Sequence, residues 1–381
     1  MENENLQEVN GNDNILELLE GIEIEKDSLL YDVKRGLEGK NEGIQCELPE
    51  LNKYLHGVQR ETFYLVGAGS TVGKSTFTNF FFFLSVYFYC KDNNIPFTLV
   101  YYSFEISKRK LRAKIAGYLV NKRHSIRISL SKILGNDSKK KMSREELEYV
   151  IKVNNEVDEI FDSIIFVDTP TNPTGINKHL MSILAELGTF HKEHYTKTSN
   201  NISEDKEKIV GYDFHEENRL FVVVLDHASL LVKEQGFTLK ETIDKAGEYF
   251  VRLRNLCKIS PVLIQQFNSD LGSTYRQQKT EQDVAPTQLD FADSKYSFNN
   301  CDVAIGLVNP TMFDLSKFGQ YKMDKMNNRF RAGFLLKNRD DDALVQFPML
   351  MDAVSGVFYE LRKEDVNAEY LEQIYEVAKY L

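Results

Sequence analysis

The sequence has no tryptophan, few glycines and prolines, and only four cysteines. With 21 glycines and 8 prolines among 381 residues, a collagen-like or low-complexity chain is excluded. The cysteines form no CxxC pair and have no histidine at zinc-site spacing, so we expect reduced, buried thiols. The longest apolar run, 80–90, is far shorter than the roughly 20 residues of a membrane-spanning helix. No secretory leader is recognised, so the sequence predicts a soluble cytoplasmic protein without a membrane partner.

The negative charge of the chain is concentrated at one end. The net charge is −10, and residues 1–48 hold 13 acidic and 4 basic residues, so they carry nine of the ten excess charges. Residues 49–381 are nearly neutral, and the composition does not argue against a polyanionic partner. The clearest basic cluster, 107–142, has 12 basic residues and one acid. A solvated helix face and a phosphate-binding surface explain it equally well.

Strand-like apolar runs alternate with longer helical patterns, which predicts βαβ units and an α/β fold with a mostly parallel central sheet. The runs are 62–66, 97–104, 164–167, 220–225, 262–264, 303–308 and 334–336. The final strands are expected to form an antiparallel extension with a turn at 340–342. Three polar stretches are predicted to be loops: 192–218, 269–288 and 316–329. Ahead of the sheet, residues 1–12 are expected to be disordered, and 14–37 have the apolar spacing of one or two short helices.

The most specific motif is GAGSTVGKST, residues 67–76, between a strand-like run and a helix expected to begin near Lys74. This context is typical of a P-loop, in which backbone N–H groups face phosphates and a lysine binds the β and γ oxygens. The Ser75 hydroxyl is the expected ligand of Mg²⁺. Ala68 replaces the first glycine of the motif, but glycines flank it. The predicted ATP-binding residues are Ala68, Gly69, Ser70, Thr71, Val72, Gly73, Lys74, Ser75 and Thr76.

Two acidic residues end strand-like runs and complete the expected nucleotide site. Asp226 follows LFVVVL, and we predict that it holds Mg²⁺ through water. Glu105 ends FTLVYYSFE, and we predict that it orients and deprotonates the attacking water. The plainer alternatives are structural: Asp226 would cap a helix, and Glu105 would belong to an N-terminal capping box.

The order and spacing of these motifs resemble the DnaB-type replicative helicases of bacteria and phages, which are RecA-like P-loop ATPases. The resemblance covers about 41–361 and includes the segments YYSFEISKRKLRAKIAG, LDHASLLV, PVLIQQFNSDL, DFADSKYSFNNCDVAIGL and GFLLKNRDDD. It departs from the family at three positions. His227 is found where the family usually has a tyrosine, Ala292 replaces an arginine and Lys295 replaces a glycine.

The resemblance implies a domain plan. We expect a disordered tail and linker helix over 1–40, a RecA-like ATPase domain over 41–365 and a C-terminal helix over 366–381. The segment before the ATPase core is too short for the helical primase-binding domain that is usual in the family. Residues 14–40 would correspond instead to the linker helix that docks on an adjacent subunit.

The resemblance also implies roles for three further residues. Gln266 would sense the γ-phosphate, and Lys337 and Arg339 would extend from a hairpin toward the nucleotide of the neighbouring subunit. A guanidinium delivered in trans neutralises charge that develops on the γ-phosphate, so hydrolysis would depend on the neighbour. The plainer alternative is an ordinary solvated hairpin tip.

In a RecA-like ring, the loops after the magnesium and sensor strands line the central channel, which makes 269–288 the candidate DNA-binding loop. Arg276 and Lys279 are the predicted contacts to single-stranded DNA, with Tyr275 as a stacking partner. The loop also contains acidic residues. The signal for DNA binding is therefore modest.

Together these features predict an ATP- and Mg²⁺-dependent DNA helicase that acts in replication as a ring, expected to be hexameric. By resemblance it would move 5′ to 3′ on single-stranded DNA, with a loader or a primase as a candidate partner. The alternative is a RecA-like recombinase or regulatory ATPase that assembles on DNA without unwinding it. A scaffold without catalysis is disfavoured by the intact nucleotide motifs. The composition suits an AT-rich bacterial or phage genome. We therefore expect the protein to act in a bacterial cytoplasm, encoded either by the bacterium or by a phage.

Overall fold

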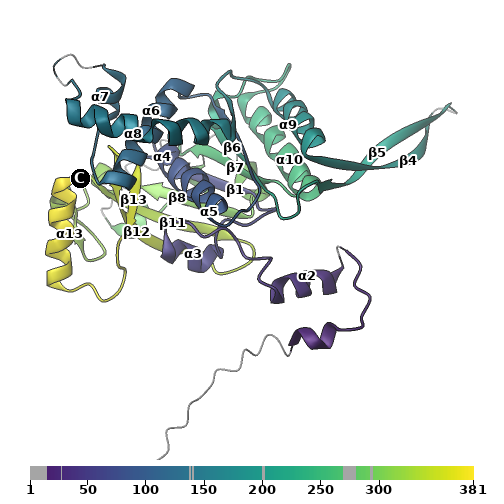
Figure 1. Cartoon of the computed structure of the whole chain (residues 1–381), viewed down its shortest axis with the longest axis horizontal. Helices are drawn as coiled ribbons and strands as arrows, with labels where there is room; N and C mark the ends of the chain where they lie inside the picture. Colours follow the sequence, from purple (N-terminus) through teal and green to yellow (C-terminus); the bar gives the residue numbers. More distant parts are fainter. Residues whose placement is uncertain are drawn as a thin grey trace, which may run out of the picture. The chain divides into compact units, whose positions relative to one another are not determined.

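Figure 1 shows the computed structural model of the chain, which describes residues 15–26, 28–136, 139, 141–199, 202–268, 280–291 and 295–381. The chain divides into two compact units, Met1–Gly43 and Ile44–Leu381. Within the described ranges, no helix is long and apolar enough to cross a membrane. The expected disorder of 1–12 concerns a segment outside the described residues.

The first unit contains two short helices, η1 (Glu17–Leu19) and α2 (Leu29–Leu37). Gly21 lies between them with a φ of 78°, a conformation that glycine adopts without a steric penalty. Ser28 caps α2, because its hydroxyl accepts a hydrogen bond from the backbone N–H of Tyr31 at 3.2 Å. The segment predicted to contain one or two short helices therefore forms two, which are separated near Gly21.

The second unit is built on a nine-stranded sheet in the order β13-β12-β11-β8-β1-β7-β6-β2-β3. Six of its strands are parallel: β1 (Tyr64–Ala68), β2 (Phe97–Ser103), β3 (Ile164–Val167), β6 (Leu220–Asp226), β7 (Ser260–Gln266) and β8 (Val303–Val308). Three antiparallel strands extend it: β11 (Phe330–Asn338), β12 (Val345–Asp352) and β13 (Val357–Glu360). The predicted α/β fold with a mostly parallel sheet is confirmed.

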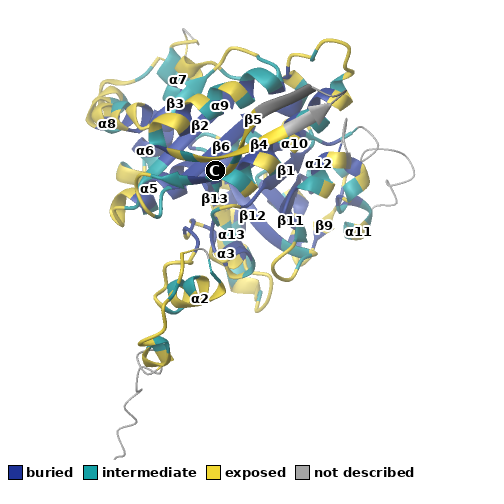
Figure 2. Ribbon diagram, turned by 90° about the vertical axis from the view of Figure 1, so that its right-hand side faces the viewer, coloured by how far each residue is buried: buried dark blue, intermediate teal, exposed yellow. Residues whose placement is uncertain are grey.

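Helices cover both faces of this sheet, so the unit has three layers with two apolar cores. Alternate β1 side chains enter opposite cores: Tyr64 and Val66 face one, and Leu65 faces the other. One face is covered by α3 (Pro49–Leu55), α4 (Lys74–Thr78), η2 (Asn79–Ser85), α5 (Val86–Asp92), α6 (Lys108–His124) and α8 (Arg144–Asp162). The other is covered by α9 (Pro173–Leu187), α10 (Leu239–Cys257) and α13 (Ala368–Tyr380). Figure 2 shows the buried strands between helices whose outer sides are exposed.

One of the predicted loops is wrong. Most of 192–218 belongs to a long antiparallel hairpin, β4 (Gly188–Ser199) and β5 (Ile202–Phe214), which projects from the body beside α9 and α10 (Figure 1). The base of the hairpin is packed, where the Tyr212 hydroxyl donates to the Leu184 carbonyl at 2.8 Å. The side chains of 192–196 and 206–208 are exposed, so neither face needs the apolar alternation that identifies a strand in a sequence.

The other predicted loops contain short elements. Residues 269–279 lie outside the described residues, and 280–291 include α11 (Glu281–Val284) and η5 (Gln288–Asp290). Segment 316–329 forms a small hairpin, β9 (Lys317–Phe318) with β10 (Tyr321–Lys322), followed by η7 (Met323–Lys325). The four cysteines are buried and unpaired, as the sequence predicts.

Candidate nucleotide site

The P-loop motif connects β1 to α4 at the edge where the parallel strands end, which we call the P-loop edge. Ala68 ends β1, residues 69–73 form the loop, and α4 begins at Lys74. Gly73 has a φ of 111°, and a Cβ added there would lie 2.7 Å from the Met351 sulfur. An L side chain would be strained at this φ and would also push aside the end of the Met351 side chain, so glycine is favoured here. The loop therefore turns tightly into the helix N-terminus, as phosphate binding requires.

The predicted magnesium ligands Ser75 and Asp226 are in contact. The Ser75 hydroxyl donates a hydrogen bond to Asp226 Oδ1 at 3.0 Å. Asp226 ends β6 and is completely buried, and this burial raises the pKa of its carboxyl to about 6, against the hydrogen bond from Ser75. A buried carboxylate beside a hydroxyl offers the hard oxygen ligands that Mg²⁺ prefers. The residues present therefore fit the ion.

Asp226 does not cap a helix. The N-cap of the following helix, η3 (Ala228–Leu230), is His227. The second oxygen of Asp226 accepts a hydrogen bond from the Tyr101 hydroxyl at 3.3 Å, from the neighbouring strand β2. The capping alternative for Asp226 is therefore wrong, and both of its oxygens point toward polar groups at the P-loop edge.

Glu105 follows β2 at the same edge and is half-exposed. Its Oε2 lies 4.0 Å from Nε2 of His227. The backbone N–H of the preceding residue, Phe104, donates to the Asp226 carbonyl at 2.8 Å. This bond joins the chain segment that contains Glu105 to the segment that contains Asp226. Ser107 is the N-cap of α6 and forms no side-chain capping bond, so Glu105 does not belong to a capping box. Its carboxylate remains available to an attacking water.

Gln266 ends β7 directly beside the P-loop. Its register partner on β1 is Ala68, and the N–H of Phe267 donates to the Ala68 carbonyl at 2.9 Å. The structure therefore brings Gln266 to the edge that also holds Lys74, Asp226 and Glu105. This is the carboxyl-terminal edge of a parallel sheet, where α/β proteins bind their ligands.

Arg331 on β11 contacts the P-loop, although the sequence analysis did not predict it. Its Nε donates to the Val72 carbonyl at 2.6 Å, and its Nη1 donates to the carbonyls of Asn328 and Phe330. Burial lowers the pKa of this guanidinium to about 10. An arginine inside an otherwise apolar strand was the available signal, because such a residue is rarely buried without a structural partner.

Lys114 on α6 was also missed. It lines a hollow together with Thr76 on α4 and Asn79 on η2. Burial lowers the pKa of its ammonium, and the charges of Asp226 and Glu105 oppose that shift. Lys114 therefore adds a second positive charge near the predicted magnesium and water-activating carboxylates. In the sequence it was one of many lysines in the basic cluster.

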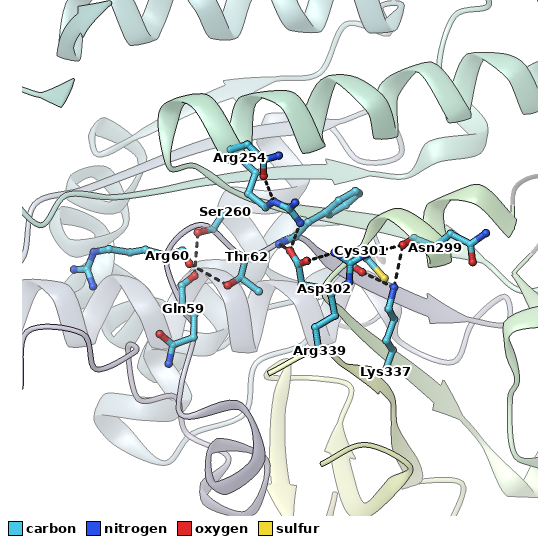
Figure 3. A network of polar contacts seen from close by, with 12 residues as sticks. Gln59, Arg60, Thr62, Arg254, Ser260, Asn299, Cys301, Asp302, Lys337 and Arg339 are labelled. Carbon is cyan, nitrogen blue, oxygen red and sulfur yellow. Dashed lines mark hydrogen bonds and ion pairs between the residues drawn. The ribbon is translucent and has the colours of Figure 1, made fainter. Parts of the chain in front are cut away.

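Lys337 and Arg339 lie at the opposite edge of the sheet, where β1 begins and β11 ends. Asn338 is paired with Val303 of β8, which in turn is paired with Tyr64 at the start of β1. The five residues of β1 span roughly 16 Å, so the two cations cannot touch phosphates held by their own P-loop. Figure 3 shows them beside Asp302 and Arg254. We call Arg254, Lys337 and Arg339 the cation cluster.

The two predicted DNA-binding residues, Arg276 and Lys279, lie outside the described residues. Five of the 12 basic residues of the cluster at 107–142 form ion pairs with acids, which favours a solvated, structural surface for that part of the cluster. The ion pairs are Arg112–Asp158, Lys122–Glu47, Arg123–Glu156, Arg127–Asp352 and Lys132–Glu146. In the described part of the chain, no group of three histidine, cysteine or acidic side chains could hold a metal ion.

Comparisons with known proteins identify the fold. No family model and no curated protein matches the sequence. The structure is similar to a solved ATPase domain of a DnaB-like helicase, with 15% identity over 90% of this chain and 100% of that chain and a TM-score of 0.62. It is also similar to a second DnaB-like replicative helicase, whose structure was described with its interactions with primase, at 16% identity, 92% and 71% coverage and a TM-score of 0.62. The predicted RecA-like fold, as found in the ATPase domains of DnaB-like helicases, is confirmed.

Proposed function

We propose that the protein is an ATPase that assembles into a ring, moves along single-stranded DNA and separates the strands of a duplex. The observation that carries this proposal is the division of the site between two edges of one sheet. The P-loop edge has the groups that bind a nucleoside triphosphate, and the cation cluster lies at the other edge. A head-to-tail contact between copies would bring the two edges together, and such contacts form a ring when the rotation between neighbours closes and a filament when it does not.

At the P-loop edge, the residues divide the work of hydrolysis. The ammonium of Lys74 and the N–H groups of the loop would bind the β and γ phosphates. Ser75 and Asp226 would hold Mg²⁺, which neutralises phosphate charge when bound. Glu105 would take a proton from the attacking water, and Gln266 would report the presence of the γ-phosphate.

Arg339 and Lys337 would act on the nucleotide of the neighbouring subunit. Positive charge aimed at the γ-phosphate stabilises the negative charge that its oxygens carry in the transition state. Because each cation reaches only the next subunit, hydrolysis at one interface would depend on the position of the neighbour. A ring of such interfaces can convert ATP turnover into ordered subunit movement.

Contact with DNA is assigned to the loop that follows the sensor strand. Arg276 and Lys279 remain the proposed contacts, because the loop that contains them follows the sensor strand β7. A hexamer, 5′ to 3′ movement, and a loader or primase as partner are proposed from the likeness to DnaB-like helicases.

The test is strand displacement on forks that carry only a 5′ or only a 3′ single-stranded tail, with ATP and Mg²⁺. We expect unwinding that requires the 5′ tail and is absent with Lys74→Ala. DNA-stimulated ATP turnover without unwinding of either fork would favour the recombinase or regulatory ATPase instead. Turnover that is unchanged in Lys74→Ala would contradict the assignment of the nucleotide site.

A further inference from the structure

Asp302 is shared by two arginines at the edge opposite the P-loop. Its Oδ1 accepts a hydrogen bond from Nη1 of Arg339 at 3.2 Å, and its Oδ2 accepts one from Nη1 of Arg254 on α10 (Figure 3). The two guanidiniums differ in exposure: 12% of the Arg254 side chain is accessible, against 46% for Arg339. One arginine is therefore a buried partner of the carboxylate, and the other can leave it.

The carboxylate itself is anchored. Asp302 Oδ2 accepts the backbone N–H of Phe63 at 2.8 Å, and the Asp302 N–H donates to the Phe63 carbonyl at 2.8 Å. These bonds join the start of β8 to the start of β1, so Asp302 cannot follow Arg339 if that side chain moves. The electrostatic attraction between the Asp302 carboxylate and the Arg339 guanidinium then determines how firmly Arg339 is retained.

A bulge in β11 precedes both hairpin cations, of which Arg339 contacts this carboxylate and Lys337 contacts backbone carbonyls. The pairing of β11 with β8 shifts between Leu335 and Lys337, which leaves Leu336 as an extra residue. Such a bulge re-aims the side chains that follow it. Lys337 Nζ donates to the carbonyls of Phe298, Asn299 and Cys301 at 2.8, 3.0 and 2.6 Å, at the end of α12 (Lys295–Asn300).

Arg339 is held more loosely than Lys337. Besides Asp302, its side chain donates only to the Asn299 carbonyl, at 2.9 Å, among the described residues. A carboxylate neutralised by one arginine attracts a second arginine less than an uncompensated carboxylate would. Without Arg254, Asp302 would have Arg339 as its one arginine partner.

We propose that Arg254 is a positioning residue that limits the hold of Asp302 on Arg339, so that Arg339 is free to engage the neighbouring subunit's nucleotide. This inference rests on the proposed action of Arg339 in trans. It assigns to α10 a role that neither the P-loop motif nor the hairpin indicates. The proposal gives Arg254 no contact with the nucleotide, because its guanidinium pairs with Asp302 and only 12% of its side chain is accessible.

The test is a charge-balance cycle measured by steady-state ATP turnover of the full chain with single-stranded DNA. Arg254→Gln should lower kcat by roughly tenfold, because the uncompensated carboxylate retains Arg339, with KM for ATP changed by less than about twofold. Arg254→Gln combined with Asp302→Asn should recover most of the lost rate, since the net charge of the group is restored. Arg254→Lys should also retain most of the wild-type kcat.

The matched control is Arg252→Gln on the same helix, because Arg252 donates to Asn177 and not to Asp302. Its kcat should equal that of the wild type. A double variant no faster than Arg254→Gln would overturn the proposal, since a purely structural role predicts added damage. If Arg254→Gln fails to fold, Asp302→Asn tests the inference instead. Its kcat should stay within about threefold of the wild-type value or rise. A fall of more than about tenfold in folded Asp302→Asn protein would contradict the inference.

Arg339→Ala in the same assay separates the two levels of the argument. If Arg339→Ala turns over ATP like the wild type, the action in trans is wrong and the proposed function fails with it. If Arg339→Ala is inactive but Arg254→Gln is not slowed, only the positioning role of Arg254 is wrong.

Discussion

The P-loop edge of the sheet carries two carboxylates, Asp226 and Glu105, near the ammonium of Lys74. At the opposite edge, Arg254 and Arg339 share the carboxylate of Asp302, and Lys337 donates to backbone carbonyls. Acids and a phosphate-binding loop suit a metal and a nucleotide, whereas surplus cations suit an anion that arrives from outside. Under the proposed function each edge is one half of a site, and the length of a strand keeps the two halves of one chain apart.

The largest effect should come from separating the two halves onto different chains. Lys74→Ala and Arg339→Ala should each reduce ATP turnover by roughly a thousandfold, because one removes phosphate binding and the other removes charge stabilisation in trans. An equal mixture should recover activity, since about a quarter of the interfaces in a randomly mixed ring would pair an intact P-loop with an intact Arg339. Turnover is measured before and after mixing. A mixture as inactive as its components would show that the two edges do not meet.

The next effect concerns the acids of the P-loop edge alone. Glu105→Gln should lower ATP turnover by about 100-fold or more, because the amide cannot accept the proton of the attacking water. Nucleotide binding, measured with a fluorescent ATP analogue, should change by less than threefold, a limit we take as roughly the precision of such titrations. Loss of binding in parallel with turnover would assign Glu105 to the binding of ATP instead of to chemistry.

A smaller effect should follow from loosening the P-loop through β11. Arg331→Met leaves the Val72 carbonyl without its donor, which should weaken ATP binding by roughly tenfold and cost about 1–3 kcal/mol of unfolding free energy. Arg329→Met is the matched control, because Arg329 lies two residues earlier on the same chain segment and its buried Nε has no hydrogen-bond partner. Equal losses of ATP affinity in both variants would exclude a specific role for Arg331.

The smallest effect should separate two adjacent tyrosines of β2. Tyr101→Phe removes a hydroxyl that donates to Asp226, so the Mg²⁺ concentration for half-maximal turnover should rise about twofold to fivefold. Tyr102→Phe removes a bond to His179 on the other face of the sheet and should leave that concentration unchanged. Titration of Mg²⁺ at saturating ATP compares them. The idea fails if both variants respond alike.

The P-loop edge was largely predictable because its residues sit at strand ends. An apolar run followed by a lone acid or a glycine-rich turn is a local pattern, and parallel strands bring such ends together at one edge. Asp226 and Ser75 are 151 positions apart, yet each was recognisable from its own neighbours. Arg331 and Lys114 were not recognisable in the same way, because their importance depends on what packs against them.

The opposite edge was predictable only in part. The resemblance identified Lys337 and Arg339, but nothing in the sequence connected them with Arg254, which lies on a helix of the other layer. The β4–β5 hairpin was predicted as a loop because its exposed strands need no apolar alternation. At the opposite edge the deciding contacts join polar residues that are distant in the sequence, such as Arg254 and Asp302.

The amino-acid sequence by itself determined the α/β alternation, the P-loop and the strand-ending acids, because each depends on local spacing and on burial of apolar runs. The tertiary structure alone decided which charges share a partner. It placed Arg254 beside Asp302 and Arg331 beneath the P-loop, and it separated Lys74 from Arg339 by the length of a strand. Electrostatic interactions depend on distance in space and on burial, and neither quantity is written in the order of residues along the chain.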